Sequence, residues 1–138
     1  MTDIMNKKSG FLGLSQKTSD ARELDALAEG GDHKAKLVFK KLTYDIVKLI
    51  GAYTAAMDGV DLIVFTAGIG EHNSRLRRRV CENLGYLGVK IDHEANKASG
   101  VNAIISAPDS KVKVALIPTE EELMIARDTM HIVSALDE

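Results

Sequence analysis

A short apolar run at residues 60–65 leads directly into a segment with two glycines at residues 66–72, and this junction most constrains the fold. The run contains Leu62, Ile63, Val64 and Phe65 in succession. A nearly continuous, β-branched apolar run is typical of a strand buried on both faces of a parallel or mixed sheet. The chain is therefore expected to be an α/β protein with a mixed sheet flanked by helices.

The glycine segment lies at the carboxyl end of this predicted strand, where open α/β sheets place their ligand crevice. Gly68 and Gly70 would let the backbone approach a phosphate or sugar without an intervening Cβ. Asn73 is a suitable N-cap for a following helix, whose free N–H groups would face an anion. A plain strand-to-helix turn is the alternative, and two glycines at this spacing do not decide between them.

The length and charge of the chain limit the number of domains and the kinds of partner it can have. With 138 residues and 45% hydrophobic content, the chain can form one globular domain with a core. A net charge of −2 argues against a nucleic-acid partner. The arginines of residues 75–79 do cluster, but apolar side chains occupy the inward face of their predicted helix, so we expect these arginines in solvent. The apolar positions are Leu76, Val80, Cys81 and Leu84.

The sequence has no apolar run near the ~20 residues of a membrane span, and no secretory leader, so we expect a cytoplasmic protein without membrane contact. Cys81 is the only cysteine. An internal disulfide and a cysteine-based metal cluster are therefore excluded, and the apolar neighbours of Cys81 predict a place in the core.

Other segments show helical or strand patterns. Asp32 is suited to cap a long buried helix, whose apolar residues recur at helical spacing. These residues are Ala35, Val38, Phe39, Leu42, Ile46, Leu49, Ile50 and Tyr53. Short strands are predicted at Leu87–Ile91 and Ala103–Ser106, flanking a helical turn near His93–Ala98. A second core strand begins with Val112, Val114 and Ile117.

The last helix opens in the segment Pro118–Glu122. Thr119 and Glu122 have the spacing of a capping box, which gives Glu122 a structural role. Glu120 and Glu121 either respond to the helix dipole or hold Mg²⁺ beside a nucleotide, and the residues leave both interpretations open. The apolar positions of this helix form one stripe. The stripe consists of Leu123, Ala126, Met130 and Val133.

A further helix start is predicted at residues 18–23, where Asp20 and Glu23 can form an N-terminal cap pair. Arg22 lies in the first turn, where a cation opposes the helix dipole unless an anion or a carboxylate compensates it. Arg22 is therefore a modest indication of a nearby phosphate.

Four segments together resemble acetate kinase, in the family's order and over essentially the whole chain. They are Ser9–Ser15, Ser19–Glu23, Phe65–Glu71 and Ile117–Leu123. The resemblance implies part of a ribonuclease-H-like domain of the actin-like sugar-kinase superfamily. It also implies transfer of the γ-phosphoryl group of ATP to acetate, which gives acetyl phosphate and ADP.

The same resemblance implies specific roles, with ATP or ADP and Mg²⁺ as cofactors. The residues expected to bind nucleotide are Asp20, Ala21, Arg22, Gly68, Ile69, Gly70, Glu71 and His72. Glu121 would hold Mg²⁺. His72 replaces the family's usual Asn, which changes the available donors and acceptors. Gln16 stands where many members have Gly.

Only the carboxyl-terminal part of an acetate kinase is matched, so we expect residues 1–138 to be one domain without the N-terminal domain. Met1 would then be an internal or engineered start. Catalytic residues are expected upstream, and the isolated chain is expected to be inactive and homodimeric. Three alternatives remain: a non-catalytic nucleotide-binding or regulatory module, a dimerisation or scaffold fragment, and a related propionate or butyrate kinase.

Overall fold

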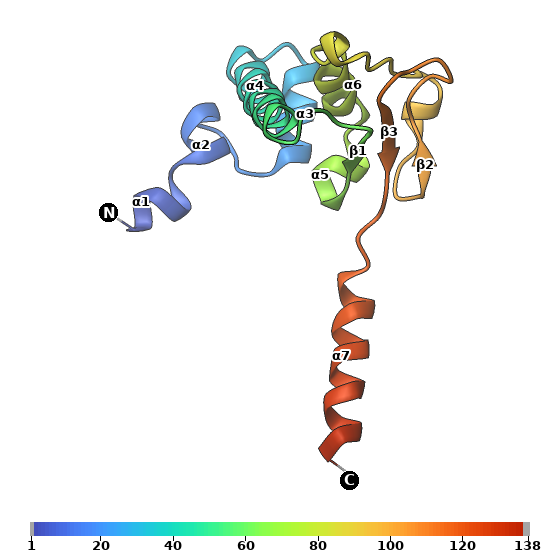
Figure 1. Ribbon diagram of the computed structural model, residues 1–138. Coiled ribbons are helices and arrows are strands. Elements are labelled where there is room, and N and C mark those ends of the chain that lie inside the picture. Colours follow the sequence, from blue (N-terminus) through green and yellow to red (C-terminus); the bar gives the residue numbers. More distant parts are fainter. Residues whose placement is uncertain (1, 137–138) are drawn as a thin grey trace.

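In a computed structural model, residues 2–136 form a small mixed sheet packed against helices on one of its faces (Figure 1). The expected α/β class is confirmed. Met1, the predicted start, lies outside the described residues. The elements are α1 (Thr2–Lys7), α2 (Gly10–Ser15), α3 (Ala21–Glu29), α4 (His33–Ala56), β1 (Leu62–Phe65), α5 (Ala67–His72), α6 (Ser74–Glu82), β2 (Ala103–Ile104), β3 (Lys113–Leu116) and α7 (Glu121–Leu136), with 3-10 turns at Gly85–Leu87 and Ala95–Lys97.

The sheet has the strand order β1-β3-β2, with β1 parallel and β2 antiparallel to the central β3. Phe65 is aligned with Leu116, so β1 and β3 end at the same edge. The strand β1 buries Ile63 and Phe65, whereas Leu62 and Val64 are exposed. The prediction of burial on both faces is therefore wrong, because no helix of residues 2–136 covers the second face.

The main core lies between the sheet and α6, with α4 packed behind it. The apolar face predicted for α6 is confirmed, since Leu76, Val80, Cys81 and Leu84 are all buried. Cys81 fills the core as expected, and burial raises the pKa of its thiol to about 12. This thiol therefore stays neutral in the folded protein.

The long helix α4 begins as predicted, because Asp32 accepts a hydrogen bond from the backbone N–H of Ala35 at 2.8 Å. Its first half packs against α3 and buries Val38 and Phe39. In its second half, however, Leu49 and Tyr53 are exposed, so the expectation of a helix buried along its length is wrong. The covering helix α3 has only nine residues and reaches only part of α4.

The segment between α6 and β3 is less regular than expected. Leu87–Ile91 is not a strand; it makes two isolated bridges, Val89 with Val112 and Ile91 with Ser106. The predicted strand at Ala103–Ser106 shortens to β2, while the helical turn near His93–Ala98 is present as a 3-10 turn. The second core strand forms as β3, with Ile117 outside it and exposed.

The last helix, α7, projects away from the body of the molecule (Figure 1). Every side chain of residues 121–135 is exposed, so no other element of residues 2–136 covers its apolar stripe. The predicted capping box is wrong, because α7 begins at Glu121, one residue too late for Thr119 to be its N-cap, and the Thr119 hydroxyl donates to Glu71 instead. Within residues 2–136, no helix combines the length and apolarity needed to cross a membrane.

Candidate functional site

The predicted glycine loop is in fact a short helix, α5, which follows β1 directly. The chain reverses at Ala67, whose φ of 56° lies in the left-handed region. A Cβ at Gly68 would meet no atom within 4 Å, whereas a Cβ at Gly70 would lie 3.4 Å from the backbone of Phe65. The two glycines therefore differ: Gly68 leaves an open surface, and Gly70 allows α5 to pack on the end of β1.

Opposite this turn lies the start of α3, where Asp20 is the N-cap as predicted. The predicted pairing with the Glu23 side chain is not seen, because the Asp20 N–H donates to the Thr18 hydroxyl at 3.1 Å. The Asp20 carboxylate accepts from the backbone N–H groups of Arg22 at 2.7 Å and Glu23 at 3.4 Å. It also pairs with the Arg22 guanidinium at 2.9 Å, and these contacts to Arg22 lower the pKa of Asp20 to about 2. A carboxylate thus compensates the cation in the first turn, and no phosphate is required to explain Arg22.

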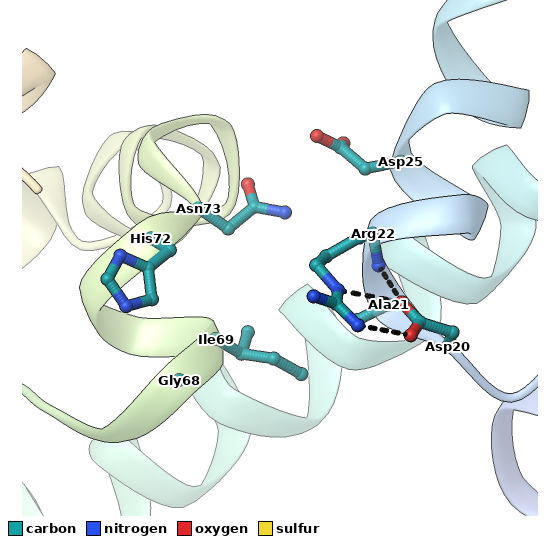
Figure 2. Close-up of a pocket in the computed structure, with 8 residues that line it drawn as sticks. All are labelled: Asp20, Ala21, Arg22, Asp25, Gly68, Ile69, His72 and Asn73. Carbon is teal, nitrogen blue, oxygen red and sulfur yellow. Dashed lines mark hydrogen bonds and ion pairs between the residues drawn. The ribbon is translucent and has the colours of Figure 1, made fainter.

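A cavity of about 540 Å³ separates the start of α3 from α5, a size suited to a small organic ligand. Its lining consists of Asp20, Ala21, Arg22, Asp25, Gly68, Ile69, His72 and Asn73. Figure 2 shows Ile69 and Asn73 extending from one side toward Arg22 on the other. Six of the eight residues predicted to contact nucleotide, from two distant segments, therefore share one cavity.

The other two predicted residues point elsewhere: Gly70 packs on Phe65, and Glu71 is turned toward Thr119. Asn73 was predicted only as a helix cap, and that role is confirmed by its 2.8 Å hydrogen bond from the N–H of Leu76. Asp25 was missed as a lining residue. The sequence could have predicted this position, because Asp25 lies one helical turn after Arg22 and so shares a helix face with it.

The side chain of His72 is held at the rim of this cavity by a second loop. Its Nδ1 lies 2.8 Å from the hydroxyl oxygen of Ser99. A Cβ at Gly100 would approach the imidazole Cε1 to 3.4 Å, so the ring lies close to that glycine. The residue that departs from the family's usual Asn therefore has its own orienting contact.

Arg75 of α6 links its helix to α3, which forms one wall of the cavity. Its guanidinium lies 3.4 Å from the Asp25 carboxylate and 2.5 Å from that of Glu29, both on α3. Arg75 is consequently half-buried and links helices, which differs from the solvent-facing position expected for it.

Arg77, expected in solvent, is instead fully buried. Its guanidinium donates to the carbonyl oxygens of Gly70 and Glu71 at 2.8 and 2.7 Å. It also donates to the carbonyl oxygens of Asn96 and Ala98, both at 2.7 Å. Burial lowers the pKa of Arg77, yet an arginine stays protonated. The burial of Arg77 could have been predicted from its spacing, because it precedes buried Cys81 by four residues and so lies on the same face of the helix.

The predicted metal ligand, Glu121, lies apart in a second cavity of about 430 Å³ lined by Thr119–Leu123. The carboxylates of this acidic turn, Glu120–Glu122, are exposed. No three His, Cys, Asp or Glu side chains among residues 2–136 converge as a metal site. The turn nevertheless fits Mg²⁺, which is commonly held by one or two carboxylates together with nucleotide phosphates and water.

These features define a class of protein: an α/β fold with a ligand cavity at the carboxyl end of a parallel strand, beside a helix start. The family model described as the acetokinase family matches residues 1–127. The chain belongs to this family, and the resemblance in the sequence is thereby confirmed.

Curated relatives carry the same name. The acetate kinase of Pseudothermotoga lettingae is 54% identical over 133 residues, covering 96% of this chain and 33% of the relative. The acetate kinase of Thermotoga maritima is 53% identical over 139 residues, covering 99% of this chain and 34% of the relative. The chain thus spans about a third of the length of the relatives it matches.

Solved structures agree. Porphyromonas gingivalis acetate kinase superimposes with a TM-score of 0.87 at 44% identity, covering 96% of this chain and 33% of the other. A propionate kinase from Francisella tularensis superimposes with a TM-score of 0.81 at 36% identity, covering 91% of this chain and 32% of the propionate kinase. The family is one of kinases, which are phosphotransferases.

Proposed function

We propose that this chain is the carboxyl-terminal, nucleotide-binding domain of an acetate kinase, in which the cavity between α3 and α5 receives ATP or ADP. In the complete reaction, an acetate oxygen attacks the γ-phosphorus of ATP. The bond from that phosphorus to the β,γ-bridging oxygen breaks, and ADP leaves. We take acetate as the acyl substrate because the curated relatives are named acetate kinase. Propionate is the alternative substrate, because one of the structural relatives is a propionate kinase.

One observation carries this proposal: two segments 45 or more residues apart, both expected from their motifs to bind nucleotide, line one cavity. Arg22 offers a cation, Gly68 an open backbone surface and Ile69 an apolar contact for a base or sugar. Bound Mg²⁺ would neutralise phosphate charge, and the resemblance assigns Glu121 to hold it.

The chain is proposed to contribute binding rather than catalysis. Phosphoryl transfer depends on positioning and on charges around the transferring group, and the resemblance assigns those residues to upstream segments. We therefore expect no acetate-dependent ADP formation by the purified polypeptide. A rate close to that of a complete acetate kinase would contradict this expectation. Homodimer formation and a cytoplasmic location stay predictions.

Calorimetric titration with ADP and Mg²⁺ tests nucleotide binding directly. Gly68→Val adds a side chain on the open cavity surface, where a Cβ meets no atom within 4 Å, and Arg22→Ala removes the cation. Each change should weaken ADP binding by about tenfold or more. Gly85→Val is a matched control, because a Cβ there also meets no atom within 4 Å and the residue lies outside the cavity.

Equal ADP affinity in Gly68→Val and in the unchanged chain would contradict the assignment of this cavity. A folded chain that binds no ADP would instead favour the dimerisation or scaffold alternative. The exposed apolar face of α7 is the observation that supports this dimerisation or scaffold alternative.

A further inference from the structure

Glu71 is a buried carboxylate that the nucleotide cavity does not use. It is 7% exposed, although it lies in α5 beside residues that line the cavity. One carboxylate oxygen accepts from the backbone N–H of Thr119 at 3.0 Å and from its hydroxyl at 3.2 Å. The Thr119 N–H lowers the pKa of Glu71, so the carboxylate is ionised near neutral pH.

The backbone that carries Glu71 is itself fixed from the opposite side. Buried Arg77 donates to the carbonyl oxygens of Gly70 and Glu71, and the same guanidinium holds the segment Asn96–Ala98. The donor set of arginine is a rigid planar fork, so these contacts define the position of α5 closely. Glu71 therefore projects from a well-anchored part of the site.

Thr119, in contrast, lies in a segment with little other support. The last hydrogen bond of the sheet on this side joins the N–H of Ile117 to the carbonyl of Phe65 at 3.0 Å. Beyond it, the acidic turn leads into α7, whose side chains over residues 121–135 are all exposed. Among the described residues, the hydrogen bonds from Thr119 to Glu71 are the ones that tie this turn to the body.

We propose that Glu71 is a positioning residue that holds the acidic turn in register with the nucleotide cavity, so that Mg²⁺ and ADP bind cooperatively. Thr119 is two residues from Glu121, and Glu71 is one residue from His72 of the cavity. One carboxylate thus connects the two parts of the site across 48 residues of sequence. The inference rests on the function proposed above, because it requires both ligands to bind this chain.

The test compares ADP affinity in EDTA with ADP affinity in saturating Mg²⁺, both by calorimetry. In the unchanged chain we expect Mg²⁺ to tighten ADP binding by about fivefold or more, the usual lower range for coupled sites. Glu71→Ala should reduce this enhancement toward one, because the turn loses its tether. Glu71→Gln keeps an oxygen that can accept both hydrogen bonds from Thr119, so it should retain most of the enhancement. ADP affinity in EDTA should change by less than about twofold, since Glu71 lies outside the cavity.

A second pair of variants guards against a trivial loss of folding. Thr119→Val removes the hydroxyl contact but keeps the backbone N–H, and should give a partial loss of the Mg²⁺ enhancement. Thr119→Ser keeps both donors and should retain the enhancement. Glu94→Gln is the control for charge, because Glu94 is an exposed carboxylate paired with Lys97. Circular dichroism of each variant checks the fold.

Two results would overturn the inference alone. One is an unchanged Mg²⁺ enhancement in a folded Glu71→Ala chain. The other is an equal loss of ADP affinity with and without Mg²⁺, which would mean that Glu71 acts only on the shape of the cavity. Absence of ADP binding in the unchanged chain would overturn the proposed function, and this inference with it.

Discussion

The two long helices, α4 and α7, carry apolar residues at the same spacing but lie in opposite surroundings. On α4, Val38 and Phe39 are each 1% exposed. On α7, Met130 and Val133 are 68% and 52% exposed. Helical spacing therefore predicts which side of a helix is apolar, whereas burial requires a second element facing that side. The helix α4 has such elements in α3 and α6. On α7, by contrast, every side chain of residues 121–135 is exposed.

The body should depend heavily on its buried polar contacts, and Arg77→Met should show the largest effect. The change leaves the carbonyl oxygens of Gly70, Glu71, Asn96 and Ala98 without their donor. An orphaned buried carbonyl is costly, so we expect a loss of about 3 kcal/mol in the free energy of unfolding. Urea denaturation followed by circular dichroism measures it.

Arg77→Lys is the matched variant, because it keeps the charge but not the planar fork. It should recover only part of the loss. A destabilisation below about 1 kcal/mol for Arg77→Met would show that the body does not rely on this contact.

A single methyl-to-hydroxyl exchange tests the apolar packing of α4. Val38→Thr keeps the side-chain shape but places a hydroxyl in the core between α3 and α4. We expect it to lower the free energy of unfolding by about 1–2 kcal/mol, because a buried hydroxyl must lose its water. The midpoint of urea denaturation should fall accordingly, and an unchanged midpoint would mean that this part of α4 is hydrated.

These contrasts show what the sequence can predict. The sequence predicts four features correctly: the junction of β1 with α5, the Asp32 cap, the Asn73 cap and the apolar face of α6. Each of them depends on local spacing or on the chemistry of a helix terminus, where neighbours in sequence are also neighbours in space. The convergence of Asp20–Arg22 with the glycine segment was implied by resemblance, and not by any local pattern.

The failures have a common physical origin, which is the dependence on distant partners. Thr119 was assigned to Glu122, three residues away, but its partner is Glu71, 48 residues away. Arg77 was placed in solvent because apolar side chains were assigned to the inward face of its helix, although carbonyl groups from two segments satisfy it in the core. Burial of β1 on both faces likewise required a covering element that local periodicity does not encode.

Backbone strain inside the body offers a stabilising change of intermediate size. Gln16 ends α2 with a φ of 56°, a left-handed conformation in which a side chain is unfavourable. Gln16→Gly should raise the free energy of unfolding by about 1 kcal/mol, because glycine adopts this angle without steric cost. Thermal unfolding measures the change. Gln16→Ala separates the strain from the contact with Lys34, and should not stabilise the protein.

The dependence of stability on acidic pH should report the contribution of Asp20, the N-cap of α3. The pKa of Asp20 is lowered to about 2 in the folded chain from an ordinary 3.8, mainly by its contacts with Arg22. A depressed folded pKa stabilises the protein above the unfolded value and loses this contribution as the pH falls toward the folded value. Between about pH 4 and pH 2, Asp20→Asn should therefore flatten the decline in stability. Urea titrations across this window test it, and parallel curves would exclude a role for this carboxyl group.

The smallest effect is expected on α7, where the exchange made at Val38 can be repeated at Val133. Val133 is half exposed, so its hydroxyl analogue keeps its water and Val133→Thr should change the free energy of unfolding by less than about 0.5 kcal/mol. Helix propensity differs little between the two residues, so it does not obscure the comparison. Equal losses at Val38 and Val133 would mean that the apolar side of α7 is packed in solution. Repeating the measurement over a range of protein concentrations would then separate packing against the same chain from packing against a second copy, since only the latter depends on concentration.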